Sequence, residues 1–313
     1  MHNNIPIVDA HQDILSPSPL NEGDQPQTSW ELLSRSSVRL VFSAVFHPDA
    51  ETRADSSFIR GELSKHLQVI AEHPGFYQVL FQDHLLAPRD GSIGIVVHVE
   101  GADALINRHI AELLLGQWFD AGVRSVGIVW NGGNQLGGGV GANRGLSRLG
   151  RHVITWLDQH NFIVDLAHMN ENTFWGTFDL IQNPPIVSHG NCRAVCNHPH
   201  NLTNAQLCDL ADRGSVLGIS LVPSFVSPNK AVTGLDLLRH FDHAINIMGI
   251  DCVGIGTDFG GIEARPLIPE LENVTHTHRI LHGLQTGLGL SDDDLAKIAF
   301  GNFERTLRTR LPA

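Results

Sequence analysis

Short apolar runs rich in β-branched residues alternate along this chain with longer stretches in which apolar residues recur at helical spacing. Such short runs, bounded by glycine, proline or polar residues, are typical of strands buried on both faces. Eight runs fit this description: Ile5–Ala10, Leu40–Phe46, Ile93–Val99, Ser125–Trp130, Phe162–Ala167, Pro185–Ser188, Val216–Val222 and Cys252–Thr257.

Helical patterns lie between these runs. They are Phe58–Glu72, Ile106–Phe119, Arg148–Gln159, Thr173–Ile181, Asn204–Arg213 and Leu235–Ile247. Repeated strand–helix units favour parallel pairing through right-handed crossovers. Eight units match a closed barrel better than an open sheet, which usually has fewer strands and a glycine-rich phosphate turn after the first. We therefore predict an α/β protein with one domain, a (β/α)8 TIM-type barrel that spans residues 1–313 and would be the catalytic domain.

Composition narrows the range of partners. The formal charge of the 313-residue chain is -12, and Lys and Arg form no cluster, which argues against a nucleic-acid partner. The first ten residues, MHNNIPIVDA, lack the basic and apolar regions of a signal peptide, so we expect a cytoplasmic protein with no membrane association. Nineteen histidines are many for this length, and several follow apolar runs.

Ionisable residues follow the predicted strands directly, and barrel enzymes build their sites from the C-terminal strand ends. These residues are His11 and Asp13 after the first strand, Glu100 after the third, His168 after the fifth, His189 after the sixth and Asp258 after the eighth. The strand-end rule therefore predicts that all of them meet at one mouth of the barrel.

His11 and Asp13 are two residues apart, so in extended backbone both side chains point to one side and could grip one ion. Imidazole and carboxylate together suit zinc or a similar divalent metal, although the pair could instead cap a strand end. Glu100 follows an apolar strand, where an unpaired charge is costly and a cation should meet it. Glu100 could therefore form a salt bridge, or its carboxylate could bridge two metal ions.

His168 and His189 each end a strand, one strand–helix repeat apart, so adjacent strands bring them side by side. A lone histidine after an apolar run is usually a core residue, whereas two in matching positions favour metal binding. His98, His152 and His160 are out of register with this mouth, and we expect no metal role for them.

Asp258 lies in the segment VGIGTDFGG, a strand that ends in a small-residue turn. There it could carry a proton to the leaving group of a hydrolysis, or it could cap a helix. The glycine-rich segment Gly132–Gly141 follows the fourth strand, lacks the Lys and Ser/Thr of a phosphate-binding loop, and is expected to be a mobile active-site loop.

At these residues the chain resembles the membrane (renal) dipeptidase family of zinc peptidases, within the amidohydrolase-like, metal-dependent barrel hydrolases. The segments that carry the resemblance are VDAHQD, HVEGAD, GVRSVGIVWN, GLSRLGRHVITWLDQHNFIVDLAHMNENTFW, PPIVSHGNCRAV, NHPHNLTNAQL, RGSVLGISLV, VGIGTDFGG and GNFERTL. Their order and spacing agree over nearly the whole chain.

The resemblance implies a binuclear site with two Zn²⁺ ions. It implies that His11 and Asp13 bind one zinc, that His168 and His189 bind the other, and that Glu100 bridges them. A hydroxide between the metals would attack the scissile carbonyl, and Asp258 matches the family's catalytic aspartate. Family members are often homodimers, so the resemblance leaves a homodimer open.

The predicted substrate wall departs from the family. Trp130 stands where the family commonly has a histidine that holds the substrate carbonyl oxygen, and Val222 stands where many members have a tyrosine. His200, in the segment HPHN, replaces an arginine that grips the substrate carboxylate. Histidine offers one donor and is largely neutral at pH 7, so dipeptide binding should suffer unless Arg193 or Arg265 compensates.

We therefore expect a zinc-dependent hydrolase of the dipeptidase type that cleaves a dipeptide or a related small amide. Two alternatives stay open. One is an amidohydrolase-type enzyme that acts on an N-acyl amino acid or a lactone. The other is a catalytically silent barrel that binds metal. Retention of all five ligands and of Asp258 favours the enzyme, because a purely structural zinc site needs no proton carrier.

Overall fold

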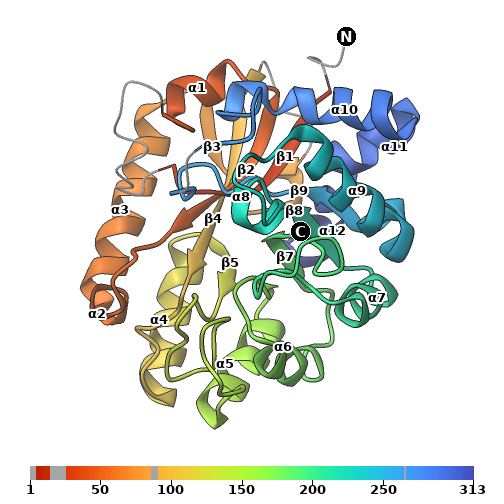
Figure 1. Ribbon diagram of the computed structural model, residues 1–313. Helices are drawn as coiled ribbons and strands as arrows, with labels where there is room; N and C mark the ends of the chain where they lie inside the picture. The colour runs from red at the N-terminus through yellow and green to blue at the C-terminus, as the bar shows by residue number, and fades with distance from the viewer. Residues whose placement is uncertain (1–4, 15–25, 86–90, 264–265) are drawn as a thin grey trace.

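The computed structural model describes residues 5–14, 26–85, 91–263 and 266–313. Its centre is a parallel sheet that closes on itself, because β2 pairs with β4 while the other neighbours follow one another around the ring (Figure 1). The barrel strands are β1 (Ile7–Gln12), β2 (Val38–Val45), β4 (Ile93–Glu100), β5 (Val123–Gly127), β6 (Ile163–Asp165), β7 (Ile186–Gly190), β8 (Val216–Ile219) and β9 (Val253–Ile255). The predicted (β/α)8 barrel is confirmed.

A further short strand, β3 (Phe76–Gln78), is the part of the sheet that the hydrophobic pattern did not predict. It pairs in parallel with the first residues of β4, from Phe76 opposite Ile93 to Gln78 opposite Ile95. The second half of β4 pairs with β5 instead. A three-residue strand is too short to show a period in sequence.

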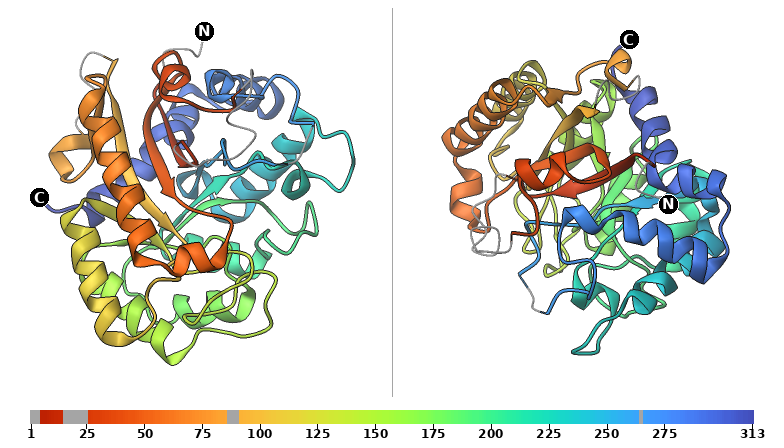
Figure 2. Two further views of the ribbon diagram at one scale, coloured as in Figure 1. Left: turned by 90° about the vertical axis from the view of Figure 1, so that its left-hand side faces the viewer. Right: turned by 90° about the horizontal axis from the view of Figure 1, so that it is seen from above.

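Helices surround the barrel in all three views (Figures 1 and 2). They are α1 (Trp30–Ser34), α2 (Ala50–Ala54), α3 (Ser56–Glu72), α4 (Arg108–Asp120), α5 (Arg148–Gln159), α6 (Glu171–Phe178), α7 (Asn204–Asp212), α8 (Pro223–Val226), α9 (Gly234–Met248), α10 (His278–Leu288), α11 (Asp292–Ala296) and α12 (Asn302–Arg310). All six predicted helices are present. Their N-termini follow polar caps such as Asn107, Ser147 and Thr203, whose side chains accept backbone N–H groups of the first turn.

Several strands end earlier than their apolar runs. The runs that continue to Trp130 and Val222 leave the sheet at Gly127 of β5 and Ile219 of β8. The remaining apolar residues turn over the barrel mouth, where a loop must still be covered from water. Hydrophobicity alone therefore marks the strand and its first loop residues together.

The interior of the barrel is apolar toward the end opposite the strand C-termini. Side chains from six strands meet there in one buried cluster with α12: Val8, Leu40, Phe42, Val96, Ile163, Ile186, Val216, Phe303 and Leu307. Residues of strands on opposite sides of a closed barrel touch only through its interior, so this cluster fills it. Phe303 lies 6.0 Å from Phe42, ring centre to ring centre, and closes the end opposite the strand C-termini.

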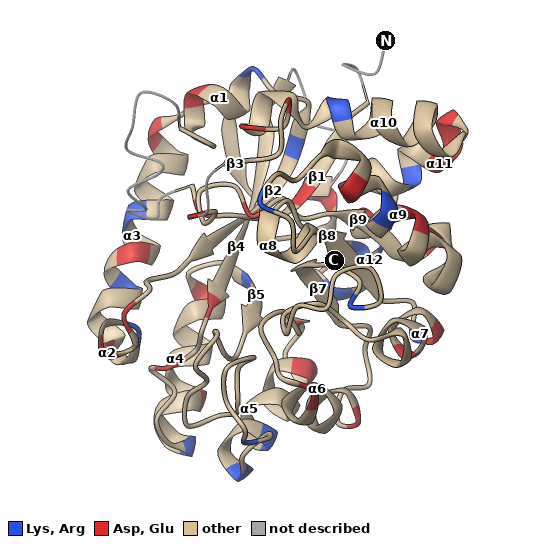
Figure 3. Ribbon diagram, viewed as in Figure 1, with Lys and Arg blue, Asp and Glu red and all other residues tan. Residues whose placement is uncertain are grey.

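Charged residues of both signs are interspersed over the outer helices in the view of Figure 3. None of the helices in the described ranges combines the length and the apolar character that crossing a bilayer would require.

Candidate metal centre

The six ionisable residues predicted for the barrel mouth all lie there. Three belong to strands: His11 is in β1, Glu100 is the last residue of β4, and His189 is in β7. The other three follow strands within three residues: Asp13 after β1, His168 after β6 and Asp258 after β9. All six are buried or nearly so, which keeps their polar atoms away from bulk water.

Glu100 is the centre of the cluster. Its Oε1 atom lies 2.7 Å from Nε2 of His168, 3.6 Å from Nε2 of His11 and 3.8 Å from Nε2 of His189. The Nε2 atoms of His168 and His189 are 2.9 Å apart. One carboxylate therefore reaches imidazoles from three strands, as a bridging ligand would.

Two further carboxylates complete one side of the cluster. Nε2 of His11 lies 3.8 Å from Oδ2 of Asp13 and 3.9 Å from Oδ1 of Asp258. Gly261 faces both acids, since a Cβ atom at that position would come within 2.4 Å of the Asp13 carboxylate and 2.6 Å of that of Asp258. A side chain at Gly261 would fill the space between these acids.

The backbone holds two of these side chains in the left-handed region. His168 has a φ of 61° and Asp258 a φ of 66°. Such a conformation costs roughly 1–3 kcal/mol for a residue with a Cβ atom, and it is concentrated at functional sites. The backbone N–H of Asp258 donates to the carbonyl oxygen of His11, which ties the end of β9 to β1.

Hydrogen bonds orient two of the imidazoles. The Nδ1–H of His168 donates to Oδ1 of Asn131 over 2.9 Å, and Nδ1 of His189 is hydrogen-bonded to Oγ of Ser188 over 2.9 Å. Each ring thus directs its Nε2 atom toward Glu100. Outer partners of this kind fix the tautomer of metal-binding histidines, and the strand-end pattern gave no signal for Asn131 or Ser188.

Burial keeps the imidazoles neutral and disfavours the charged form of the carboxylates. Desolvation lowers the pKa of His168 to about 3 and holds those of His11 and His189 well below the usual value. Desolvation also raises the pKa of Glu100 to about 7, and that of Asp258 well above its usual value, with repulsion from Asp13 adding to the effect. Neutral imidazoles and uncompensated carboxylates are the groups that a divalent cation stabilises.

A second polar layer lies below the mouth. His98, in β4, has Nε2 3.5 Å from Oδ2 of Asp165 and a ring 5.4 Å from that of His11. It lies two residues before Glu100 and points to the same side of the strand, a spacing that would have revealed this inward position. The sequence placed His98 out of register with the mouth, but its ring faces the barrel interior, and its ligand atom lies within 4.8 Å of those of His11 and Asp165. The expectation that His98 has no metal role stays a prediction. His152 and His160 lie on the outside of α5, against Glu112 and Trp156.

The donor set fits divalent metal ions. Ligand atoms of His11, Asp13 and Glu100 lie within 4.8 Å of one another, as do those of His168, His189 and His200. The Nε2 atom of His11 is buried and has no hydrogen-bond partner among the described residues, so its lone pair is available. Imidazole nitrogen with carboxylate oxygen is the combination that zinc and similar ions take.

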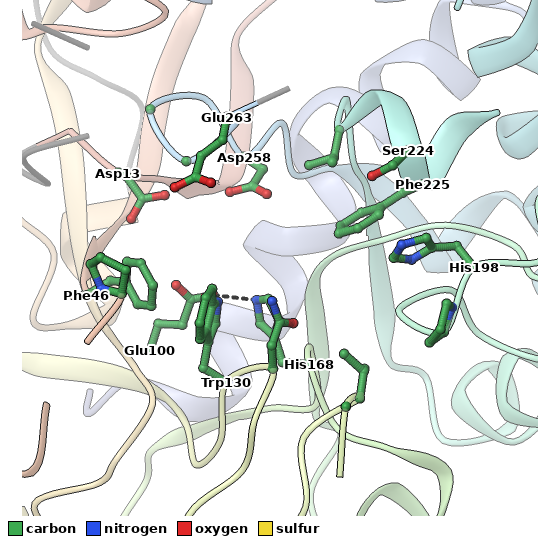
Figure 4. Close-up of a pocket in the computed structure, with 18 residues that line it drawn as sticks. Asp13, Phe46, Glu100, Trp130, His168, His198, Ser224, Phe225, Asp258 and Glu263 are labelled. Atoms are coloured by element: carbon green, nitrogen blue, oxygen red, sulfur yellow. Dashed lines mark hydrogen bonds and ion pairs between the residues drawn. The ribbon is translucent and has the colours of Figure 1, made fainter. Parts of the chain in front are cut away.

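A cavity of about 500 Å³ opens over this cluster. Figure 4 shows Asp13, Asp258 and Glu263 along one edge, Glu100 and His168 on its floor, and aromatic walls. Those walls are Phe46, Trp130 and Phe225. Trp130 is held from behind, because the guanidinium of Arg53 lies 5.2 Å from its ring centre. Sequence reasoning missed Glu263, which stands in no recognisable motif.

The three positions predicted to bind substrate differ in placement. Trp130 and Val222 line the cavity, whereas His200 does not. The imidazole of His200 is buried behind Phe225, on which it stacks at 4.2 Å, and it contacts the rings of His168 and His189.

Of the two arginines predicted to compensate, only Arg193 belongs to the described residues, and it does not line the cavity. Arg193 is held outside it by an ion pair with Glu171 and by hydrogen bonds to the carbonyl oxygens of Pro199 and Asn201. Arg265 lies outside the described residues. Arg193 is therefore a support of the loop that carries His200.

The glycine-rich segment packs closely against its neighbours, and two of its residues, Val140 and Gly141, line the cavity. That the segment is mobile stays a prediction. Gly138 N donates to Thr173 Oγ1, and Gly141 N donates to the carbonyl oxygen of Asn131. A Cβ atom at Gly139 would come within 1.8 Å of the carbonyl oxygen of Trp130. The glycines allow this close backbone packing, and the packed loop presents Asn131 to His168.

A closed parallel barrel with imidazoles and carboxylates gathered at its C-terminal mouth defines a metallo-hydrolase of the barrel type. The chain belongs to the membrane dipeptidase family, peptidase family M19, whose sequence model matches residues 1–310.

Known relatives agree with this assignment. The chain is 33% identical over 231 residues to an uncharacterized Klebsiella pneumoniae protein encoded in the pqqA 5′ region, a match that covers 70% of this chain and 83% of that protein. A metallo peptidase of Rhodobacter sphaeroides, solved with a phosphinate mimic of L-Ala-D-Ala, superposes with a TM-score of 0.87 at 22% identity over 98% of this chain and 99% of that one. The dipeptidase AC superposes with a TM-score of 0.88 at 22% identity, over 99% of this chain and 100% of that one. At these identities the structural matches show the fold.

Proposed function

We propose that this protein is a binuclear zinc-dependent hydrolase that cleaves the amide bond of a dipeptide or a related small substrate. The observation that carries the proposal is the convergence of five potential ligands from four strand ends around the Glu100 carboxylate. A bound metal pair supplies Lewis acidity and an activated water at neutral pH.

The five ligands divide into two sets that share Glu100. His11 and Asp13 come from one strand end and would hold one zinc ion. His168 and His189 come from neighbouring strands and would hold the other. Glu100 lies between the sets and would bridge them. Asn131 keeps His168 in the tautomer that leaves Nε2 free for metal, and Ser188 holds the ring of His189 in place.

Asp258 is the residue best placed to move a proton. Its carboxylate lines the cavity beside Asp13 and lies 3.9 Å from His11. In this mechanism it accepts a proton from the attacking water and delivers it to the leaving amine. The left-handed turn at Asp258 holds the carboxylate over the floor of the cavity, where that transfer takes place.

The walls of the cavity favour a substrate without the usual free carboxylate. Among the described residues that line it, none is a Lys or Arg that could pair with a carboxylate, and Glu263 adds a negative charge outside the proposed metal centre. An apolar or aromatic group would pack against Phe46, Trp130 and Phe225. We therefore add a lactone, which has no carboxylate, as the second candidate. An N-acyl amino acid keeps its carboxylate and is a candidate only if that group is bound away from His200.

Elemental analysis of purified protein, combined with a substrate panel, tests the proposal. The panel holds L,L and L,D dipeptides, their amides, N-acyl amino acids and lactones. We expect two metal ions per chain, and a kcat that falls by about 10²–10⁴-fold in Asp258→Asn with the metal content retained.

Three results would each count against one part of the proposal. A metal-free protein with no hydrolytic activity after zinc is added would refute the metal centre. Activity that survives in Asp258→Asn would refute its role in proton transfer. Ordinary L,L dipeptides exceeding every other substrate by orders of magnitude in kcat/KM would refute the altered specificity alone.

A further inference from the structure

His200 is a buried imidazole without a partner. Its side chain is 5% exposed, and within the described part of the chain neither ring nitrogen has a hydrogen-bond partner. Leaving a buried polar group unsatisfied costs roughly 1–3 kcal/mol. Two such nitrogens on one ring indicate that a ligand normally meets it.

The ring of His200 faces the second pair of metal-binding histidines. Its centre lies 4.5 Å from that of His168, nearly perpendicular to it, and 5.1 Å from that of His189. One ligand atom from each of the three side chains lies within 4.8 Å of the other two. Three imidazole nitrogens at such distances could converge on one ion after shifts of about 1 Å, since zinc–nitrogen bonds are about 2.0–2.1 Å long.

The surroundings fix the ring in this position. Phe225 stacks on it at 4.2 Å with an angle of 11° between the planes. The neighbouring Asn201 donates to the carbonyl oxygens of Cys196 and Phe225, and Arg193 donates to the carbonyl oxygen of Pro199. The loop therefore presents His200 from a rigid support, away from the cavity surface.

We propose that His200 is a third imidazole ligand of the metal ion held by His168 and His189. This inference rests on the proposed metal centre. Three imidazoles and the Glu100 carboxylate would give the ion four protein ligands, and zinc can expand to five-coordinate, which would leave a position for the water of the proposed reaction. The position that the family resemblance assigns to a carboxylate-binding arginine thus serves the metal in this chain, and the substrate is held by the cavity walls instead.

Cobalt(II) binding to the metal-free full-length protein tests the inference. Co²⁺ is titrated into wild type, His200→Ala and His200→Gln, and the visible absorption spectrum and the dissociation constants are recorded. We expect the affinity of one site to fall at least about 100-fold in both variants, because even outer partners of metal ligands are worth about 10–100-fold. We also expect one fewer paramagnetically shifted, exchangeable ring N–H resonance in the proton NMR spectrum.

His198→Asn is the matched control. His198 lies on the same loop and lines the cavity, but its ring belongs to none of the ligand groups found among the described residues. Its Nδ1 atom accepts a hydrogen bond from the backbone N–H of His200, and an asparagine oxygen can accept the same bond. The control should bind Co²⁺ as wild type does.

The outcomes separate this inference from the proposed function. Wild type that binds no Co²⁺ would overturn both. Wild type that binds two ions, with the same constants and spectrum in His200→Ala, would overturn the role of His200 alone. If the alanine variant is unstable, the glutamine variant, which fills most of the ring's volume, decides by the same measurements.

Discussion

At the scale of single residues, the geometry of the centre depends on side chains that would not touch a metal. Asn131 is the clearest case, because its Oδ1 accepts the hydrogen bond that fixes the His168 ring. We predict that Asn131→Ala weakens zinc binding by about 10–100-fold. Calorimetric titration of the metal-free protein with Zn²⁺ measures this change. Asn131→Asp retains an acceptor oxygen and should stay near wild type, and equal losses in both variants would contradict the orienting role.

Glu263 is the acidic residue at the edge of the cavity that no ligand group requires. Its position favours a contact with a cationic part of the substrate, such as a free amine. We predict that Glu263→Gln raises KM for amine-bearing substrates by roughly fivefold at most, since exposed charge pairs are weak. Steady-state kinetics on matched free and N-acetylated substrates checks this. An equal change for both substrates would exclude the contact.

Single residues differ in how well sequence reveals them. His11, Glu100 and Asp258 were predictable because the end of an apolar run locates the mouth of a barrel. Ser188 and Glu263 carry no such signal, since a serine within a strand or a glutamate in a loop usually has no special role. Only the folded chain shows that Ser188 contacts the ring of His189 and that Glu263 lines the cavity.

At the scale of elements, a buried histidine joins α3 to β2. Nε2 of His66 is hydrogen-bonded to Oγ of Ser43 over 2.8 Å, and its Nδ1–H donates to the carbonyl oxygen of Glu62 over 3.2 Å. Both ring nitrogens are thus satisfied in the neutral form. Burial lowers the pKa of His66 from its usual 6.5 to about 4.

This pKa predicts the direction of a pH effect on stability. Between pH 6.5 and 4 the unfolded chain binds a proton at His66 that the folded chain does not. The free energy of unfolding therefore falls as pH drops through this window, by about 3 kcal/mol from this group. In His66→Gln, urea unfolding between these pH values should show a correspondingly shallower dependence on pH. An unchanged slope would contradict the assignment.

The elements themselves were largely predictable. Strands of a parallel barrel are buried on both faces, so they appear as apolar runs, and capped helices stand between them. The predicted C-terminal ends of β5 and β8 were wrong, because apolar residues continue from these strands into the loops at the barrel mouth. Helices α10 and α12 were missed, since no strand follows them to define a repeat.

At the scale of the whole molecule, Phe303 of α12 seals the end of the barrel opposite the metal centre. It is 1% exposed, and a Cβ atom on Gly254 of β9 would come within 2.5 Å of its ring. We predict that Phe303→Ala lowers the free energy of unfolding by about 3–5 kcal/mol while the folded fraction keeps its metal affinity. Chemical denaturation measures the loss. Phe81→Ala is the control, because Phe81 is 43% exposed and should change stability by about 0.5 kcal/mol or less.

The apolar cluster around Phe303 also determines by which end of the barrel substrate enters and products leave. With one end of the barrel filled by hydrocarbon, reactant and water enter where both hydrolysis fragments must leave. Each product therefore occupies part of the cavity that the next substrate molecule needs, and accumulated products should slow turnover as competitive inhibitors. In a barrel closed at one end, substrate and products share a single opening.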